Sequence, residues 1–296
     1  SKIDGVQYYS TIMGYSMITG SYSTNTAFVF VALKPWEERK HTVFDIIKQT
    51  NSEFAREITE ATAIAFGPPP IIGLGTGAGF TIMIQDKTGN TPEYLSDETR
   101  KFIAAASKRP EIGRIYSVYR SNVPQKRIAL DLDKAEKLGV DISEINSTIS
   151  AYLGSSYVND FNKFGRQYKV FVQAESQYRL SPQDLNLFFV RSRTGNIVPV
   201  NTLVTVSDTT GPEFTNRFNM FWAAEVNGTP AEGYSSAQAL KALEETAEQV
   251  LPKGMGFAWS NMSYQEKAAE GTAAVMFATA LVFVFLILAA QYESWR

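Results

Sequence analysis

The chain has 296 residues, 44% of them hydrophobic and 20% charged, with a formal net charge of −2. Such a length is enough for about two to four compact domains, and the composition excludes both a disordered chain and a basic nucleic-acid-binding protein. The chain has no cysteine and one histidine, His41, which excludes disulfides and cysteine metal sites and argues against a serine–histidine triad. Most common catalytic chemistry is therefore hard to assemble from these residues.

The first elements in chain order are two strands joined by a loop. Residues 6–12 and 26–33 are β-rich runs, and the stretch between them contains glycine and serine. Residues 43–58, opened by Thr42, carry apolar side chains at helical spacing, and residues 61–66 predict the next strand. The order strand, strand, helix, strand predicts an αβ sandwich whose first strand and helix lie upstream of Ser1.

A second unit of the same kind begins after three consecutive prolines and is divided into two halves. Each half is predicted to be a strand, a helix and a strand, at residues 80–85, 96–107 and 115–119, and then at 218–226, 235–251 and 256–260. We therefore predict a domain inserted between Asn122 and Asn216, since insertion at an exposed strand connection is well tolerated.

The inserted segment reads as a structural or docking module. Its predicted elements are a strand at residues 127–132, a helix opened by Ser143, a β-rich run at 167–174, and a final pair at 188–193 and 197–206. The connector Thr194-Gly195-Asn196 between the last two runs is typical of a hairpin turn. Its charge pattern does not indicate a substrate.

Residues 271–291 contain no charge and approach the ~20 apolar residues that a helix needs to cross a bilayer. They have no polar face, and Tyr292 and Trp295 follow them, as is typical of a membrane interface. The alternative is a buried core helix. The first five residues lack an initiator methionine and the features of a signal peptide, so we expect a fragment of a larger membrane protein.

Four glycines alternate with other residues at Gly73, Gly75, Gly77 and Gly79. A phosphate-binding loop would need a helix after the glycines and, in a P-loop, a lysine. Here the glycines lead into the β-rich run that starts at Phe80, so we expect a flexible hinge between two domains.

The loop from Gly14 to Gly20 carries large apolar side chains, whereas a solvated connector is normally polar. With Ile12, Phe28 and Phe30 on the adjoining strands, it predicts a cleft that accepts apolar ligands without fixed hydrogen-bond geometry. The alternative is a loop that packs on its own core. The methionines allow a second alternative, a soft-metal site for copper(I) or silver(I), formed by Met13, Met17 and Met83.

Several stretches together resemble one family, the hydrophobe/amphiphile branch of the resonance-nodulation-division (RND) efflux pumps. The matching stretches are Lys137-Leu-Gly-Val with Ile145-Asn146, Gly154-Ser-Ser-Tyr-Val-Asn-Asp-Phe161, Asn261-Met-Ser-Tyr-Gln-Glu266 and Ala289-Ala-Gln-Tyr-Glu-Ser-Trp295. They follow the family's order and spacing across nearly the whole chain. The chain as a whole resembles the second large periplasmic loop of these transporters.

The resemblance implies an α+β fold of repeated ferredoxin-like βαβ sandwich subdomains. It implies porter subdomain PC1 at residues 1–77, PC2 in two halves at 78–121 and 217–262, docking subdomain DC at 122–216, and a transmembrane helix at 272–290.

The resemblance also implies which residues bind substrate. The loop at residues 14–20 matches the family's switch loop, Ile12 and Phe30 match positions in a distal drug pocket, and Phe80, Ile82, Ile84 and Glu225 match the cleft between PC1 and PC2. The full set implied is Ile12, Gly14, Tyr15, Met17, Ile18, Gly20, Phe28, Phe30, Phe80, Ile82, Ile84 and Glu225. The chain departs from the family pattern at Ser10, Ser16, Met17, and Tyr119 with Arg120.

The function implied is export of amphiphilic drugs, dyes, detergents or bile-salt-like molecules, without catalysis or cofactor, by alternating access in a homotrimer. Its implied partners are a periplasmic membrane-fusion adaptor and an outer-membrane channel, with the chain mostly periplasmic at the bacterial inner membrane. The proton-relay residues belong to helices outside this chain. Two alternatives stay open: heavy-metal export through the methionines, and a membrane-anchored adaptor that uses its αβ domains only for assembly.

Overall fold

The computed structural model describes residues 3–293, which form two compact units. The first unit contains the residues up to Ser121 and those from Pro212 onward, and the second contains Asn122–Gly211. Helices occur together with several small antiparallel sheets, which confirms a mixed helix and sheet fold.

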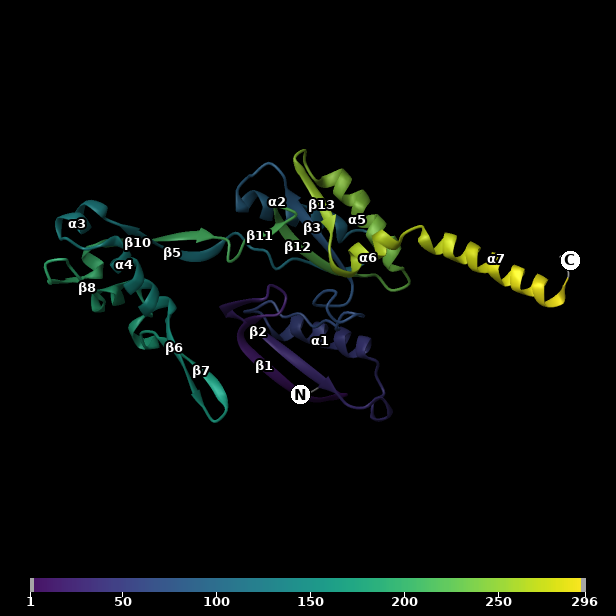
Figure 1. The fold of residues 1–296 in the computed structure, drawn as a ribbon, viewed down its shortest axis with the longest axis horizontal. Helices are drawn as coiled ribbons and strands as arrows, with labels where there is room; N and C mark the ends of the chain where they lie inside the picture. The colour runs from purple at the N-terminus through teal and green to yellow at the C-terminus, as the bar shows by residue number, and fades with distance from the viewer. Residues whose placement is uncertain (1–2, 294–296) are drawn as a thin grey trace. The chain divides into compact units, whose positions relative to one another are not determined.

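The first unit begins with a long antiparallel hairpin formed by β1 (Val6–Ser16) and β2 (Ser21–Leu33) (Figure 1). Both strands run further than the sequence predicts, because Tyr15 pairs with Tyr22 and Ser16 with Ser21. Only a four-residue turn is left of the predicted loop. The helix α1 (Val43–Glu57) follows as predicted and is opened by a capping box between Thr42 and Asp45.

The strand predicted at residues 61–66 is wrong, because these residues pair with no strand. A side chain of α1 binds their backbone instead: Asn51 Nδ2 donates to the Ala65 carbonyl at 2.8 Å, and the Ala65 N–H donates to Asn51 Oδ1 at 2.9 Å. An asparagine amide presents the same donor and acceptor as a peptide group, so it takes the place of a neighbouring strand.

A five-stranded antiparallel sheet forms the centre of the first unit. Its strands run in the order β11-β12-β3-β13, with β4 paired to β12; they are β3 (Phe80–Asp86), β4 (Ile112–Tyr116), β11 (Asn216–Phe218), β12 (Phe221–Pro230) and β13 (Met255–Trp259). The helices α2 (Pro92–Ala106) and α5 (Ser236–Val250) pack on one face, where Phe102, Leu240 and Leu243 meet side chains of β3 (Figure 1).

Two predicted boundaries in this sheet move for identifiable reasons. The helix α2 begins at Pro92, four residues before the predicted start, because the Thr91 side chain caps it and proline suits the first turn. The single strand predicted at residues 218–226 is broken by Asn219 and Met220, whose φ angles of 49° and 72° turn the chain from β11 into β12.

The glycine-rich segment before β3 is closely packed at its end. Gly79 has a φ of +114°, and a Cβ there would lie 2.0 Å from the Gly228 carbonyl oxygen of β12. A Cβ on Gly77 would lie 2.8 Å from the Phe66 ring. The absence of a side chain on these two glycines therefore allows neighbouring backbone and ring atoms to come close. Glycine also accepts the positive φ at Gly79.

The second unit contains three two-stranded antiparallel sheets, β5-β10, β6-β7 and β8-β9. Its elements are β5 (Val123–Leu130), α3 (Leu132–Lys137), α4 (Ile142–Ile149), β6 (Ser156–Lys163), β7 (Arg166–Val172), β8 (Phe189–Arg191), β9 (Ile197–Pro199) and β10 (Val204–Gly211). Ile145, Val200 and Leu203 are at the centre of its separate core. The hairpin predicted at Thr194-Gly195-Asn196 is confirmed, whereas β6 was not predicted.

Short helical turns complete both units. They are 3-10 turns at Trp36–Glu38, Ser176–Tyr178, Pro182–Leu187 and Val200–Thr202, and a π turn at Ser150–Gly154.

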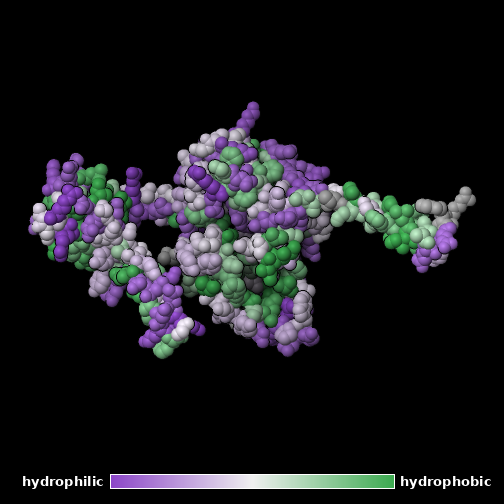
Figure 2. Space-filling model, in the orientation of Figure 1, coloured by the Kyte–Doolittle hydropathy of each residue, from purple (hydrophilic) through white to green (hydrophobic). Residues whose placement is uncertain are grey.

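The first unit ends in α6 (Asn261–Ala269) and α7 (Thr272–Tyr292). In the described range, α7 is the one helix long and apolar enough to cross a membrane, and its span Val275–Tyr292 is exposed, as the hydrophobic surface in Figure 2 shows. The predicted interface residue Trp295 lies outside the described residues. The Thr81 N–H donates to Ser263 Oγ at 3.0 Å, which fixes α6 to β3.

The close approach at Gly79 predicts a large loss of stability when a methyl group is added there. Gly79→Ala is expected to lower the free energy of unfolding by about 3–5 kcal/mol, because it combines an unfavourable φ with a backbone clash. Gly89→Ala is the matched control: its φ is +79° but no atom lies within 4 Å of the added Cβ, so a loss of about 1–2 kcal/mol is expected. Urea unfolding in detergent, followed by tryptophan fluorescence, measures both, and equal losses would contradict the packing argument.

Candidate functional site

The β1–β2 hairpin places three of the predicted site residues on one face. Ile12 pairs with Phe28, and Ser10 pairs with Phe30. Because directly opposite residues share a face and side chains alternate along each strand, Ile12, Phe28 and Phe30 lie on the same side. The two phenylalanine rings meet edge to face, 4.7 Å apart, and Ile12 and Phe30 are 41% and 51% exposed. Among the described residues, this face is accessible apolar surface.

A third aromatic ring joins this face from outside the hairpin. Phe66 lies 6.4 Å from Phe28, ring centre to ring centre, and its backbone segment is fixed by the bonds between Asn51 and Ala65. Phe66 is not among the predicted site residues, because residues 61–66 were expected only to form a strand. An aromatic residue directly before the glycine and proline run was the one local signal.

The turn of the hairpin carries the other predicted loop residues. Tyr15 packs its ring 5.2 Å from Tyr22, while Met17 and Ile18 are half-buried in the turn. Gly14 and Gly20 adopt φ angles of +75° and +65°, which a glycine accepts without strain. The Gly20 N–H donates to the Ser16 carbonyl at 2.9 Å, so the turn is an ordered structure.

Three predicted site residues are located elsewhere. Phe80, Ile82 and Ile84 are at most 2% exposed and belong to the core between the five-stranded sheet and its helices. This burial argues against direct contact with a ligand, and the function proposed below does not depend on them.

Glu225 lies on the opposite face of that sheet from this core. It pairs with Met83, one residue out of phase with the core side chains of β3. A chain of hydrogen bonds ends at its carboxyl group: Thr81 Oγ1 donates to Asn227 Oδ1 at 2.9 Å, and Asn227 Nδ2 donates to Glu225 Oε1 at 2.8 Å.

Burial raises the pKa of Glu225, and the hydrogen bond from Asn227 opposes this only in part. Tyr116 pairs with Asn227 across the sheet, and burial likewise raises the pKa of Tyr116, with a further contribution from Glu225. The sheet therefore has a half-buried carboxyl group that holds its proton at higher pH than an exposed glutamate.

The comparisons with known proteins identify the family. The model of the AcrB/AcrD/AcrF family matches residues 2–296. The chain belongs to this family.

Among its relatives, the multidrug/solvent efflux pump membrane transporter MepB of Pseudomonas putida is 37% identical over 296 residues, covering 99% of this chain and 28% of MepB. The toluene efflux pump membrane transporter TtgB, also of Pseudomonas putida, is 36% identical, covering 99% of this chain and 28% of TtgB. The multidrug export protein AcrF of Escherichia coli (strain K12) is 35% identical, covering 98% of this chain and 28% of AcrF.

These matches confirm the resemblance to RND efflux transporters. The chain spans 28% of the length of each relative.

The described residues give no support to a metal site. They contain no group of three histidine, cysteine, aspartate or glutamate side chains arranged to hold an ion. The methionines of the soft-metal alternative belong to different environments, since Met13 is 77% exposed on the hairpin and Met83 is enclosed in the five-stranded sheet at 5%.

The environment of Glu225 predicts a pH dependence of stability. Its native-state pKa lies above the ordinary value of 4.5, so the folded protein binds the proton more tightly than the unfolded chain. Stability is therefore expected to fall as the pH rises from 4.5 through the raised pKa. Glu225→Gln removes this ionisation while keeping an oxygen for Asn227, and it is expected to raise the free energy of unfolding at pH 7 and to flatten its pH dependence.

The control is Glu248→Gln, which removes the same charge from an exposed position on α5. Urea unfolding of both variants between pH 4.5 and pH 8 tests the expectation. A Glu225→Gln curve parallel to that of the wild type would contradict it.

Proposed function

We propose that this chain is the periplasmic porter and docking portion of an RND efflux transporter that binds and exports amphiphilic molecules. The observation that carries the proposal is the exposed apolar face of the β1–β2 hairpin in a chain of this family. The relatives are named transporters, and transport without catalysis is the function proposed here.

The subdomain architecture is part of the proposal. The sheet formed by residues 78–121 and 217–262 has the element order βαβ and βαβ and the strand order β4-β12-β3-β13, which supports a ferredoxin-like porter subdomain PC2. Residues 1–77 would then be PC1 and 122–216 the docking subdomain DC.

The hairpin face suits ligands of varied shape. Phenylalanine and isoleucine side chains give dispersion and ring contacts that do not require a fixed hydrogen-bond geometry. The half-buried Met17 adds a flexible thioether that can repack around different ligands. We therefore propose broad specificity for amphiphilic drugs, dyes, detergents and bile-salt-like molecules, in line with relatives named for multidrug, solvent and toluene efflux.

The proposed mechanism is alternating access in a homotrimer. The porter subdomains PC1 and PC2 would move apart to admit a ligand and close to expel it, driven by proton flux through membrane helices outside this chain. The helix α7 would span the inner membrane, with the preceding residues in the periplasm. The docking subdomain would face a periplasmic adaptor and an outer-membrane channel.

The hairpin site predicts a loss of export when its aromatic rings are removed. In cells that carry the full-length transporter, Tyr15→Ala with Phe30→Ala is expected to lower export of several unrelated amphiphiles about tenfold or more. The reason is that each large apolar side chain contributes about 1.5–3 kcal/mol when it is buried against a ligand. Drug susceptibility at matched expression measures this.

The matched control removes two exposed aromatic rings outside the hairpin, Phe44 and Tyr234, by substitution to alanine. It is expected to leave susceptibility unchanged. If the hairpin variant also exports every amphiphile normally, the binding face is wrongly assigned, and a protein used only for assembly becomes the better interpretation.

A further inference from the structure

The five-stranded sheet contains a cavity that is separate from the hairpin face and from Glu225. It has a volume of about 200 Å³ and lies where β3 ends and α2 begins. Trp222 of β12 pairs with Asp86 of β3 at this end of the sheet, and both residues line the cavity. Their register places them on the face that carries α2 and α5, the side away from Glu225.

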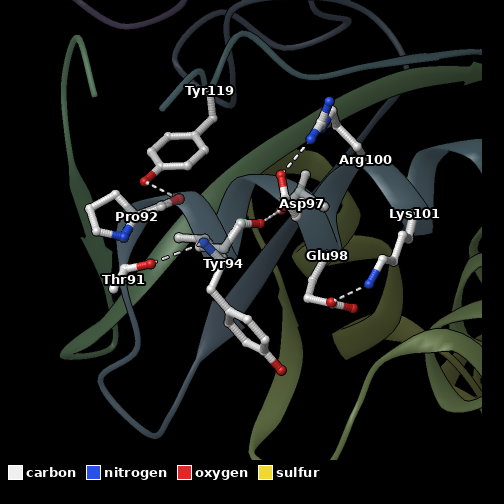
Figure 3. Close-up of polar contacts among 10 residues, drawn as sticks. Thr91, Pro92, Tyr94, Asp97, Glu98, Arg100, Lys101 and Tyr119 are labelled. Carbon is white, nitrogen blue, oxygen red and sulfur yellow. Dashed lines mark hydrogen bonds and ion pairs between the residues drawn. The ribbon is translucent and has the colours of Figure 1, made fainter. Parts of the chain in front are cut away.

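The wall of the cavity is apolar and aromatic. Its apolar residues are Pro92 and Leu95 from α2, Tyr119 after β4, and Trp222. The position of Tyr119 is fixed, because its hydroxyl donates to the Pro92 carbonyl at 3.4 Å and its ring meets Phe214 edge to face at 6.0 Å. Figure 3 shows the Tyr119 ring beside Pro92 at the first turn of α2. The wall is therefore preformed.

The charge balance of the cavity favours a neutral ligand. Among the described residues that line it, Asp86 alone carries a charge. Burial by itself would raise the pKa of Asp86, but hydrogen bonds from Thr88 and Asn90 lower it overall. The carboxylate accepts the backbone N–H of both residues, the Thr88 hydroxyl and the Asn90 amide. Neutral donors thus occupy the carboxylate oxygens while the negative charge remains, so an anionic ligand is disfavoured and a neutral ligand has to bind through the other groups of the wall.

The cavity also contains a side-chain amide without a protein partner among the described residues. The side-chain amide of Asn216 makes no hydrogen bond to any residue in the range 3–293, although its backbone pairs with Ala223 in the sheet. A half-buried amide of this kind offers both a donor and an acceptor to a ligand.

The volume sets the size of the ligand. An apolar cavity of about 150 Å³ is large enough to hold benzene, so about 200 Å³ accommodates one aromatic ring with a small substituent.

We propose that this cavity binds small neutral molecules of the phenol class, with the ring against Trp222 and Tyr119 and the hydroxyl at the Asn216 amide. The inference depends on the geometry of the five-stranded sheet and does not require the proposed export function.

The absence of cysteine in the sequence allows a direct test. Thr215 is exposed and lines the cavity, so Thr215→Cys introduces a single thiol at its rim. The 296-residue chain is reconstituted in lipid nanodiscs, and the rate of thiol alkylation by a maleimide is measured with increasing phenol. Saturating phenol is expected to slow alkylation at least threefold, because the bound ring shields the rim.

The matched control is Thr209→Cys, an exposed threonine in the second unit, where phenol is expected to leave the rate unchanged. Adding Asn216→Ala to Thr215→Cys is expected to raise the half-maximal phenol concentration about fivefold, the usual effect of one lost hydrogen bond. Protection by toluene, which lacks the hydroxyl, is expected to be the same with and without Asn216→Ala.

Two results would overturn the proposal. Equal alkylation at position 215 with and without phenol would show that the cavity is not a binding site. Equal slowing at positions 215 and 209 would show a general effect of phenol on the protein or the lipid. Either result is separable from failure of the export function, because the measurement does not involve transport.

Discussion

The first unit depends on the pairing of β3 with β12, two strands that are separated in the chain by the whole second unit. β3 is buried along its full length and is hydrogen-bonded on both edges, to β12 and to β13. Its apolar side chains hold α2 and α5 on one face, and the backbone N–H of Thr81 holds α6 on the sheet through Ser263. The connection between α7 and the sheet, the cavity beside Trp222 and the position of Glu225 all follow from this pairing.

Close backbone approach is what allows β12 to return to β3 after so long an excursion. At the start of β3, Gly79 faces the carbonyl of Gly228 without a side chain on either residue. A pair of glycines at this point removes the steric barrier that any larger residues would create. Gly79 is thus part of the packing of the sheet and Gly77 lies against the Phe66 ring, whereas a Cβ on Gly73 would have no atom within 4 Å.

Much of this fold follows from local sequence patterns. The predictions that are wrong concern segments whose structure depends on a partner distant in sequence. The helix α5 was predictable because Leu240, Leu243 and Ala247 recur at helical spacing and are buried. The segment at residues 61–66 has the composition of a strand, but composition does not reveal that Asn51 binds its backbone. In the site, the shared face of Phe28 and Phe30 follows from the period of a strand, whereas the contact with Phe66 does not. The run from Phe80 to Ile84 is apolar in sequence whichever side of the sheet the helices cover. Its burial under α2 and α5 could therefore not be predicted without the structure.

The contrast between the hairpin and the sheet explains why apolar surface is exposed in one and enclosed in the other. In the five-stranded sheet, two helices cover the apolar face and each strand gains packing from its neighbours. Within residues 3–293 the hairpin forms a sheet of its own two strands, and a two-stranded hairpin has too little surface to build a core of its own. Its rings stabilise it by pairing across and along the strands, as Tyr15 does with Tyr22 and Phe28 with Phe30, while Tyr22 and Phe30 stay exposed. In the export function proposed above, a ligand that covers these rings would add burial to the hairpin, so binding would stabilise this element.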